Sequence, residues 1–188
     1  MALPPSLRIA LKEWAVVCDA LSQGEQILLL RKGGIYESAG EFELEHREFV
    51  LFPTYLHQNA QMLKPFYQRG VEKRDAEPGE LTLSSAGVVT DIIQLQSRPQ
   101  MDRLDDQHIW TAPLIDMRFN YRAENPLYLL VVRAYRLQAP LKIANTPAYA
   151  GCKSWVPLDQ PVDVRNAKPV LVDEQFESRR SLVLKEVA

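Results

Sequence analysis

The sequence predicts an α+β protein in which a strongly bent or barrel-like sheet is flanked by helices at the front, in the middle and at the end of the chain. Three observations carry this prediction. The first is an amphipathic pattern that runs from Leu7 to a glycine stop at Gly24. The second is a series of short apolar runs of strand type, of which Leu127–Leu137 is the strongest. The third is the shortness of most links between these runs, which favours neighbouring strands in a curved sheet.

Length and composition limit the interpretation. The chain has 188 residues, the size of one ordinary domain, and 46% of them are hydrophobic against 24% charged. We therefore expect a single domain over residues 1–188, with a core from about residue 6 to residue 172 and a C-terminal helix from about residue 173 to residue 187. The formal net charge of −2 gives no general attraction to nucleic acid, so such binding would need a local basic patch.

Cysteine content and hydropathy bear on compartment and cofactors. Two cysteines, Cys18 and Cys152, are too few for a disulfide scaffold or a self-contained zinc site. Charged residues between positions 12 and 19 interrupt any apolar stretch of signal-peptide type. The longest wholly apolar run, Leu127–Val132, is far too short to span a bilayer. We expect a cytoplasmic protein with no membrane partner, no cofactor and no bound metal.

The first elements follow from helical spacing and from glycine positions. Ser6 is a suitable N-cap, and apolar residues at helical spacing predict a helix from Leu7 to Leu21 that ends at Gly24. Residues Gln26–Arg31 are apolar on both faces until the last, which predicts a strand in the centre of its sheet. A turn is expected at residues 33–34.

The following segment alternates between acidic and apolar residues. This alternation predicts a half-exposed strand over Glu41–Glu48, and a buried strand follows at Phe49–Phe52. A short helix is expected at Tyr55–Lys64 with Thr54 as its cap. The polar residues 68–80 are predicted to form a long surface loop.

The second half of the chain adds further strands and helices, so that about six or seven strands are expected in all. In chain order the predictions are one or two strands in Leu81–Leu95, a charged loop or short helix at Arg98–Gln107, a helix at Thr111–Arg122 with Thr111 as cap, the strand Leu127–Leu137, a turn and strand at Gly151–Val156, a short strand at Val170–Val172 and a final helix from about Glu174 capped by Asp173.

Four segments, LKEWAVVCDALSQGEQILLLRKGG, FELEHREFVLFPTYLHQ, YRLQAPLKI and GCKSWVPL, resemble a bacterial family catalogued as domain of unknown function 1802. The resemblance covers roughly Leu11 to Leu158. It implies no established activity. Because some members occur with restriction-endonuclease-type domains, it implies restriction-type proteins as partners.

The pattern of a helix followed by Gly24 and Arg31 resembles, more remotely, the ASCH group of PUA-like barrels, whose motif G-x-K-x-x-E-x-R runs into the first strand. Gln26 stands where that motif has lysine, and Leu29 where it has glutamate. The lysine and glutamate are implicated in the amide hydrolysis carried out by a few ASCH proteins, so their replacement here implies binding without catalysis. The resemblance also implies a PUA-like or ASCH-like bent sheet or small β-barrel that binds RNA or modified DNA in a cleft beside the barrel.

Basic and aromatic residues near strand ends and late turns form the first candidate site. Basic groups contact phosphates, and aromatic faces stack on unpaired bases. The structural alternative is that the arginines pair with the 24 acidic residues of the chain. The residues that we expect to bind a ligand or nucleic acid are Gly24, Arg31, Lys32, Arg118, Tyr121, Arg122, Arg133, Lys153 and Trp155.

Acidic residues and histidines form the alternative site. Glu43, Glu45, His46 and His57 offer carboxylate and imidazole ligands, which would suit a metal-dependent nuclease or hydrolase of a restriction-type system. A solvated strand face with histidines hydrogen-bonded at its end explains the same residues more simply. A third interpretation is a protein-interaction partner in a larger complex.

Overall fold

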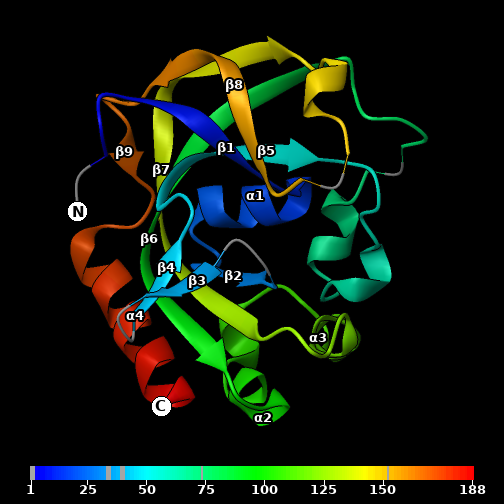
Figure 1. Ribbon diagram of the computed structural model, residues 1–188, viewed down its shortest axis with the longest axis vertical. Coiled ribbons are helices and arrows are strands. Elements are labelled where there is room, and N and C mark those ends of the chain that lie inside the picture. Colours follow the sequence, from blue (N-terminus) through cyan, green and yellow to red (C-terminus); the bar gives the residue numbers. More distant parts are fainter. Residues whose placement is uncertain (1–2, 33–34, 39–40, 73, 152) are drawn as a thin grey trace.

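The computed structural model describes residues 3–32, 35–38, 41–72, 74–151 and 153–188, and the side chains of residues 36–38 and 41–43 lie outside this description (Figure 1). The α-helices are α1 (Ala15–Gln23), α2 (Arg98–Asp102), α3 (Ala112–Asn120) and α4 (Asp173–Val187). The strands are β1 (Ser6–Trp14), β2 (Leu28–Arg31), β3 (Ile35–Ser38), β4 (Glu41–Leu44), β5 (Glu48–Thr54), β6 (Glu80–Leu95), β7 (Leu127–Ala144), β8 (Trp155–Asp163) and β9 (Lys168–Pro169). Short 3-10 helices lie at Ala60–Met62, Tyr67–Gly70, Asp105–Gln107 and Pro147–Tyr149.

A seven-stranded sheet forms the framework, in the order β2-β7-β6-β5-β1-β8, and β9 pairs with β7 outside this path. β1 and β5 are parallel, and the other neighbours are antiparallel. The sheet bends around α1 (Figure 1), while β3 and β4 form a separate hairpin. The predicted α+β class with a bent sheet is confirmed. The sheet is open, because no pairing within the described residues joins β8 to β2, so the small closed barrel is not formed.

Strands β6 and β7 form a long antiparallel ribbon that runs through both halves of the molecule (Figure 1). Residues predicted as one or two strands form the single strand β6. β7 is longer than predicted, because its pairing with β6 resumes past Pro140, where Leu141 and Ile143 lie opposite Leu83 and Leu81. A register shift between Leu83 and Ser85 separates this second stretch of pairing from the first.

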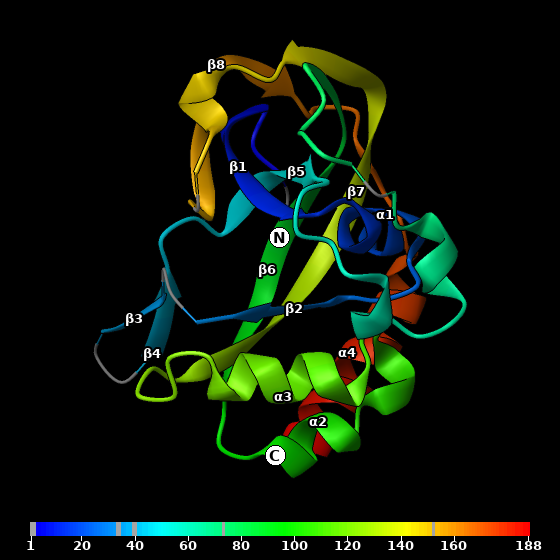
Figure 2. The same ribbon diagram turned by 90° about the vertical axis from the view of Figure 1, so that its right-hand side faces the viewer.

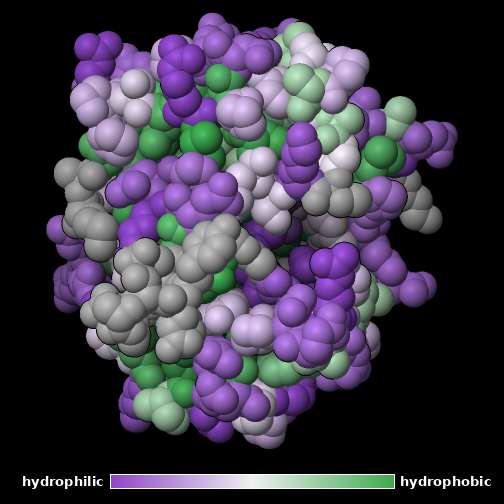
Figure 3. Space-filling view, in the orientation of Figure 1, coloured by the Kyte–Doolittle hydropathy of each residue, from purple (hydrophilic) through white to green (hydrophobic). Residues whose placement is uncertain are grey.

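Two apolar cores lie on opposite faces of β5. Phe49 and Leu51 belong to the larger core, which also contains α1, β2 and residues of α2, α3 and α4. Val50 and Phe52 belong to the smaller core, which is enclosed by β1, β8 and the far ends of β6 and β7. Alternate side chains of a strand point to opposite faces, so a strand with a core on each side is apolar throughout. Outside these cores, hydrophilic side chains cover most of the face shown in Figure 3, and apolar ones appear between them in small areas.

The predicted helix from Leu7 is wrong in its first half, which is strand β1. Ala10 and Leu11 are neighbours in sequence and both are fully buried, because β1 lies between β5 and β8 with a core on each face. A register shift between Leu7 and Ile9 also changes which side chains point inward. Together these effects reproduce the apolar spacing of a helix in a strand, and α1 begins only at Ala15.

The end of α1 is as predicted. Gly24 has a φ of 74°, in the left-handed region, and the amide of Glu25 donates to the carbonyl of Ala20 at 2.9 Å. A Cβ at this position would lie 2.7 Å from Cδ2 of Leu171. Both the backbone conformation and the close approach of the segment before α4 therefore require glycine.

The strand predicted at residues 26–31 is β2, but it lies at one end of the strand order and not in the centre. Leu28, Leu29 and Leu30 are nonetheless buried. Figure 2 shows the reason, since β2 crosses the molecule between α1 and α3. The apolar residues on both faces of β2 are therefore explained by the helices that pack against it, and not by a central position in the sheet.

The remaining predictions of single helices and strands are confirmed in part. α2, α3 and α4 are confirmed as helices, with Thr111 as the N-cap residue of α3. The helix predicted at Tyr55–Lys64 is wrong, since only the 3-10 turn Ala60–Met62 forms there. The strand predicted at Glu41–Glu48 ends at Leu44. The turn predicted at residues 33–34 lies outside the described residues.

The predicted strand at Val170–Val172 is also wrong. The pairing with β7 falls two residues earlier, at β9, although the amide of Val170 still donates to the carbonyl of Ala134 at 2.9 Å. Asp173 is the first residue of α4 and pairs with Arg133 instead of acting as the N-cap. No helix among the described residues is long and apolar enough to cross a bilayer.

At the other end of the strand order lies β8, which contains Pro157 and Pro161. Proline within a sheet is found essentially on edge strands, at strand starts or at bulges, because it has no amide hydrogen to donate. The position of β8 fits this rule.

Candidate functional site

The main cavity lies where the parallel strands β1 and β5 end. Trp14 and Thr54 are the last residues of these strands, are register partners, and both line the cavity. Its volume is about 610 Å³. The remaining lining residues come from the ends of the same strands, from two loops and from the turn before β8: Lys12, Phe52, Leu56, His57, Glu77, Pro78, Gly79, Asn145, Thr146, Pro147, Tyr149, Ala150, Gly151 and Lys153.

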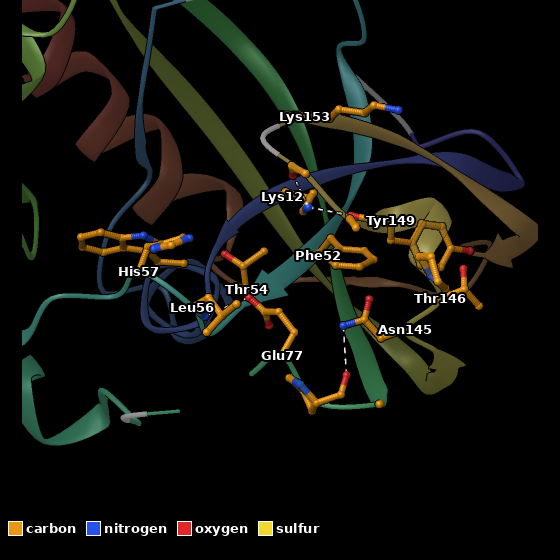
Figure 4. Close-up of a pocket in the computed structure, with 16 residues that line it drawn as sticks. Lys12, Phe52, Thr54, Leu56, His57, Glu77, Asn145, Thr146, Tyr149 and Lys153 are labelled. Atoms are coloured by element: carbon orange, nitrogen blue, oxygen red, sulfur yellow. Dashed lines mark hydrogen bonds between the residues drawn. The ribbon is translucent and has the colours of Figure 1, made fainter. Parts of the chain in front are cut away.

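Lys12 fastens β1 to the loop before β8. Its Nζ donates to the carbonyls of Tyr149 at 2.7 Å and Gly151 at 2.9 Å, as Figure 4 shows. The same ammonium lies 6.0 Å from the ring centroid of Phe52. The positive charge of Lys12 is therefore held in place by backbone carbonyls at the wall of the cavity.

Residues 77–79 form a strap that is attached on both sides of the cavity. On one side the carboxylate of Glu77 accepts from the amides of Tyr55 at 3.0 Å and Leu56 at 2.9 Å. On the other side the Asn145 side-chain amide donates to the carbonyl of Pro78 at 3.0 Å. In the predicted helix these two amides would have been at the N-terminus, where backbone amides have no partner within the helix. The Glu77 carboxylate satisfies them instead.

Aromatic rings form one side of the cavity. The rings of Phe52 and Tyr149 meet edge to face, with centroids 5.5 Å apart (Figure 4). The Tyr149 hydroxyl lies 3.0 Å from a carboxylate oxygen of Asp159 and accepts from the Asp159 amide at 3.2 Å. Burial raises the pKa of the Tyr149 phenol. Both the ring and the hydroxyl of Tyr149 are therefore held by neighbouring groups in this wall.

Polar groups of the cavity retain capacity for hydrogen bonds. Asn145 uses one amide hydrogen on the strap, and its side-chain oxygen points toward Phe52 in Figure 4. The Thr54 hydroxyl donates to the carbonyl of Glu13 at 3.0 Å, which leaves its lone pairs to accept. A Cβ placed on Gly79 would meet nothing within 4 Å, so the strap leaves open space at this point.

Among the predicted site residues, Arg31 lies in a buried ion pair. Its Nη2 is 2.9 Å from Glu13 Oε2 and 3.2 Å from the carbonyl of Lys12, and its side chain is 11% exposed. Burial lowers the pKa of the Arg31 guanidinium, Glu13 raises it, and Arg118 lowers it further. Arg31 therefore holds β2 to β1 from inside the protein.

Lys32 has a structural contact of its own. Its Nζ donates to the carbonyls of Phe119, Arg122 and Asn125 at 2.9, 3.1 and 3.0 Å. The carbonyls at the end of a helix have no partner within the helix, and a cation suits this position. Lys32 thus completes the C-terminal end of α3.

Arg133 and Gly24 likewise support the fold. The Arg133 guanidinium pairs with Asp173 and lies 5.3 Å from the ring centroid of Phe176, both on α4. The carbonyl of Gly24 accepts from Arg179 of the same helix at 2.6 Å. These contacts attach α4 to the sheet.

The other predicted residues fall into three places. Arg118, Tyr121 and Arg122 lie at or just after the end of α3. Arg118 is close enough to affect the pKa of Arg31, and Arg122 lies 5.4 Å from the ring centroid of Tyr121. Lys153 is exposed and lines the cavity. Trp155, two residues later, packs edge-on against Phe49 at 5.5 Å between centroids. The structure therefore brings only Lys153 of this set to the main cavity.

The residues of the alternative metal site are separated in their contacts. His46 Nε2 lies 3.7 Å from Glu45 Oε1, and the His46 ring packs against Trp155. His57 lines the main cavity, with a φ of 68°. The side chain of Glu43 lies outside the description. Among the described residues, no three His, Cys, Asp or Glu side chains are placed to hold a metal ion.

Several cavity residues were not found from the sequence. Lys12 and Trp14 were assigned to a helix, which hid their position at the end of a strand beside Thr54. Glu77 and Asn145 stand in segments that carry only loop signals. The Pro-Gly pair after Glu77 is a turn signal, and it was the one local indication that a strap lies here.

These features define an α+β protein with an open, bent sheet and a cavity of small-ligand size at the ends of two parallel strands. The profile of the family described as "Domain of unknown function (DUF1802)" matches residues 10–181, and the chain belongs to this family. Comparison with the curated proteins finds none that matches.

Among solved structures, the chain is similar to the crystal structure of a mutant form of the ZmASCH protein from Zymomonas mobilis. The two are 10% identical, with a TM-score of 0.45 over 97% of this chain and 99% of that chain.

Proposed function

We propose that the protein is a nucleic-acid-binding module that takes one unpaired base of RNA or modified DNA into the main cavity and does no chemistry on it. The observation that carries the proposal is a cavity of about 610 Å³ lined by aromatic rings and hydrogen-bonding side chains. Small-molecule sites typically have volumes of roughly 300–1,000 Å³. Bases outside a duplex are recognised by stacking on aromatic faces and by hydrogen bonds to their edges.

The lining residues divide naturally into roles for such a ligand. Trp14, which is partly exposed, supplies ring surface for stacking, and the buried ring of Phe52 supports the cavity wall. Asn145 can both donate to and accept from a base edge. Lys153 is exposed at the cavity and suits a phosphate of the same strand. The proposed base site therefore lies at the ends of β1 and β5, and Lys153 is the member of the predicted set that lines it.

Binding is favoured over catalysis by the state of the charged groups. A general base or nucleophile must be within reach of the substrate and able to give up or take a proton there. Lys12 is held by two backbone carbonyls, and the Glu77 carboxylate accepts from two backbone amides. Both groups build the walls of the cavity, which supports a role in shaping the site.

The test is fluorescence anisotropy with labelled single- and double-stranded RNA and DNA, with and without modified bases, at low and at physiological ionic strength. We expect sub-micromolar, salt-dependent binding with a preference for single strands. Gly79→Phe should weaken this binding, because a large side chain would enter the open space beside the strap, whereas Gly79→Ala should leave it nearly unchanged.

The contribution of the Lys153 charge to binding is tested with a matched control variant. Lys153→Ala should reduce the salt dependence, whereas Lys185→Ala, an exposed lysine on α4, should not. Absence of binding to every oligonucleotide at low salt would refute the proposal. So would binding that is unaffected by both Gly79→Phe and Trp14→Leu while the two variants melt cooperatively like the parent protein.

A further inference from the structure

A second, smaller hollow is also lined by Trp14. Trp14 lines both this hollow and the main cavity, so the two sites share a wall. α3 runs alongside β2 at this point (Figure 2). The hollow has a volume of about 10 Å³ and is lined by Glu13, Trp14, Leu30, Trp110, Leu114 and Arg118.

Positive charge exceeds negative charge around this hollow. Arg31 and Arg118 lie close enough that Arg118 lowers the pKa of Arg31, although burial is the largest cause and Glu13 acts in the opposite direction. Glu13 pairs with Arg31. Within the described part of the chain no carboxylate pairs with Arg118. The carboxylate of Glu13 therefore balances only one of the two guanidinium charges of Arg31 and Arg118.

Both arginines also have an unused donor. Nε of Arg31 and Nε of Arg118 are buried and have no hydrogen-bond partner among the described atoms. Buried donors are normally paired, and a charged one without a partner is costly. Arg118 lines the hollow, and Arg31 lies close enough for the two charges to interact, so the unpaired donors and the excess positive charge indicate that an anion completes this site.

We infer that the hollow beside Arg118 is a phosphate subsite, which holds a phosphodiester of the same strand whose base enters the main cavity. The inference rests on the proposed function, since the base site supplies the strand. Trp14 would then line both the base site and the phosphate site. Arginine suits this role because its planar fork of donors matches phosphate oxygens.

The size of the hollow limits how much of the phosphate group can enter it. A volume of about 10 Å³ has room for roughly one water-sized group. One non-bridging oxygen fits there, and the rest of the phosphodiester remains at the mouth, in contact with solvent. The apolar side chains of Leu30, Trp110 and Leu114 around the oxygen strengthen its attraction to Arg118 by excluding water.

The test replaces single phosphates of a short single-stranded oligonucleotide by neutral methylphosphonate linkages, one position at a time. In the parent protein one position should lose roughly tenfold or more in affinity, as expected for a charged hydrogen bond. In Arg118→Ala the charged oligonucleotide should bind more weakly by a similar factor, and the neutral linkage at that position should make no further difference. Arg8→Ala, an exposed arginine on β1, is the control and should keep the position effect.

The outcomes separate the inference from the proposed function. If Arg118→Ala retains the position effect, or if no single linkage matters in the parent protein, the phosphate subsite is refuted even though the oligonucleotide binds. If no oligonucleotide binds at all, the proposed function fails, and pyrophosphate is titrated by calorimetry. Binding of pyrophosphate that Arg118→Ala abolishes would retain the anion site, and absence of such binding would overturn it.

Discussion

His108 should make the protein less stable in mild acid. Its side chain is 5% exposed, and it lies in the loop before α3, with its ring centroid 5.3 Å from that of Trp110. Burial, followed by the nearby charge of Lys64, lowers the pKa of the imidazole from 6.5 to about 4, although Asp105 opposes this. The unfolded chain therefore takes up a proton near pH 6.5, whereas the folded chain takes it up only near pH 4.

The sign and size of the effect follow from this difference. Above about pH 6.5 the imidazole is neutral in both states and has no effect on the free energy of unfolding. As the pH falls from 6.5 towards 4, the unfolded state binds more protons, so stability is lost. Since one pKa unit corresponds to about 1.4 kcal/mol, the loss amounts to about 3 kcal/mol by pH 4.

The measurement is urea unfolding of the parent protein and of His108→Gln at a series of pH values. Glutamine can still form hydrogen bonds but takes up no proton in this range, so it should flatten the dependence between pH 6.5 and pH 4. His57→Asn is the matched control, because asparagine tolerates the φ of 68° and removes an exposed histidine. If the parent protein and His108→Gln show parallel pH profiles, the reasoning is wrong.

Two further predictions concern buried structure. Glu13→Gln should cost about 3–5 kcal/mol in the free energy of unfolding, because it leaves the Arg31 charge buried without its carboxylate. Chemical denaturation measures this, and Asp163→Asn, in the exposed pair with Arg165, should change the stability little. Gly24→Ala should cost more than Gly151→Ala by thermal melting. Both glycines have positive φ, but only at Gly24 does the new Cβ collide with another side chain.

Each of these predictions has a contrary result. A Glu13→Gln variant as stable as Asp163→Asn would mean that Arg31 reaches water or another partner. Equal losses of thermal stability in the two glycine variants would mean that backbone strain alone causes the loss. The segment before α4 would then move away from the new Cβ at no cost in stability.

Local signals in the sequence predicted the elements that depend on local chemistry. Gly24 ends α1 because a left-handed residue is needed at that point, and Thr111 stands at the N-cap of α3. The apolar run beginning at Leu127 is a strand, as its β-branched and aromatic content indicated. In each case the physical cause lies within a few residues of the feature.

The features that failed depend on distant partners. β1 resembles a helix in its apolar spacing only because it has a core on both faces and a register shift near Ile9. Arg31, Lys32 and Arg133 look like surface cations in the sequence, but their partners lie far along the chain, in β1, in the segment that ends α3 and in α4. Sequence reveals the residue type, whereas the partner is set by the tertiary fold.

The main cavity was not found from the sequence for the same reason. The main cavity exists because β1 and β5 pair in parallel, which places Trp14 beside Thr54 although a helix and three strands separate them along the chain. No local pattern indicates that pairing. The strap at Glu77 adds a second distant contact to the same place.

The prolines of β8 bear on how the protein behaves at high concentration. An open sheet has two ends at which a strand from another molecule could add, and such addition is the first step towards fibrils. A strand that approached β8 would meet Pro157 and Pro161, neither of which can donate a hydrogen bond. This end of the sheet is therefore a poor template for growth, and the protein can keep its sheet open without inviting aggregation there.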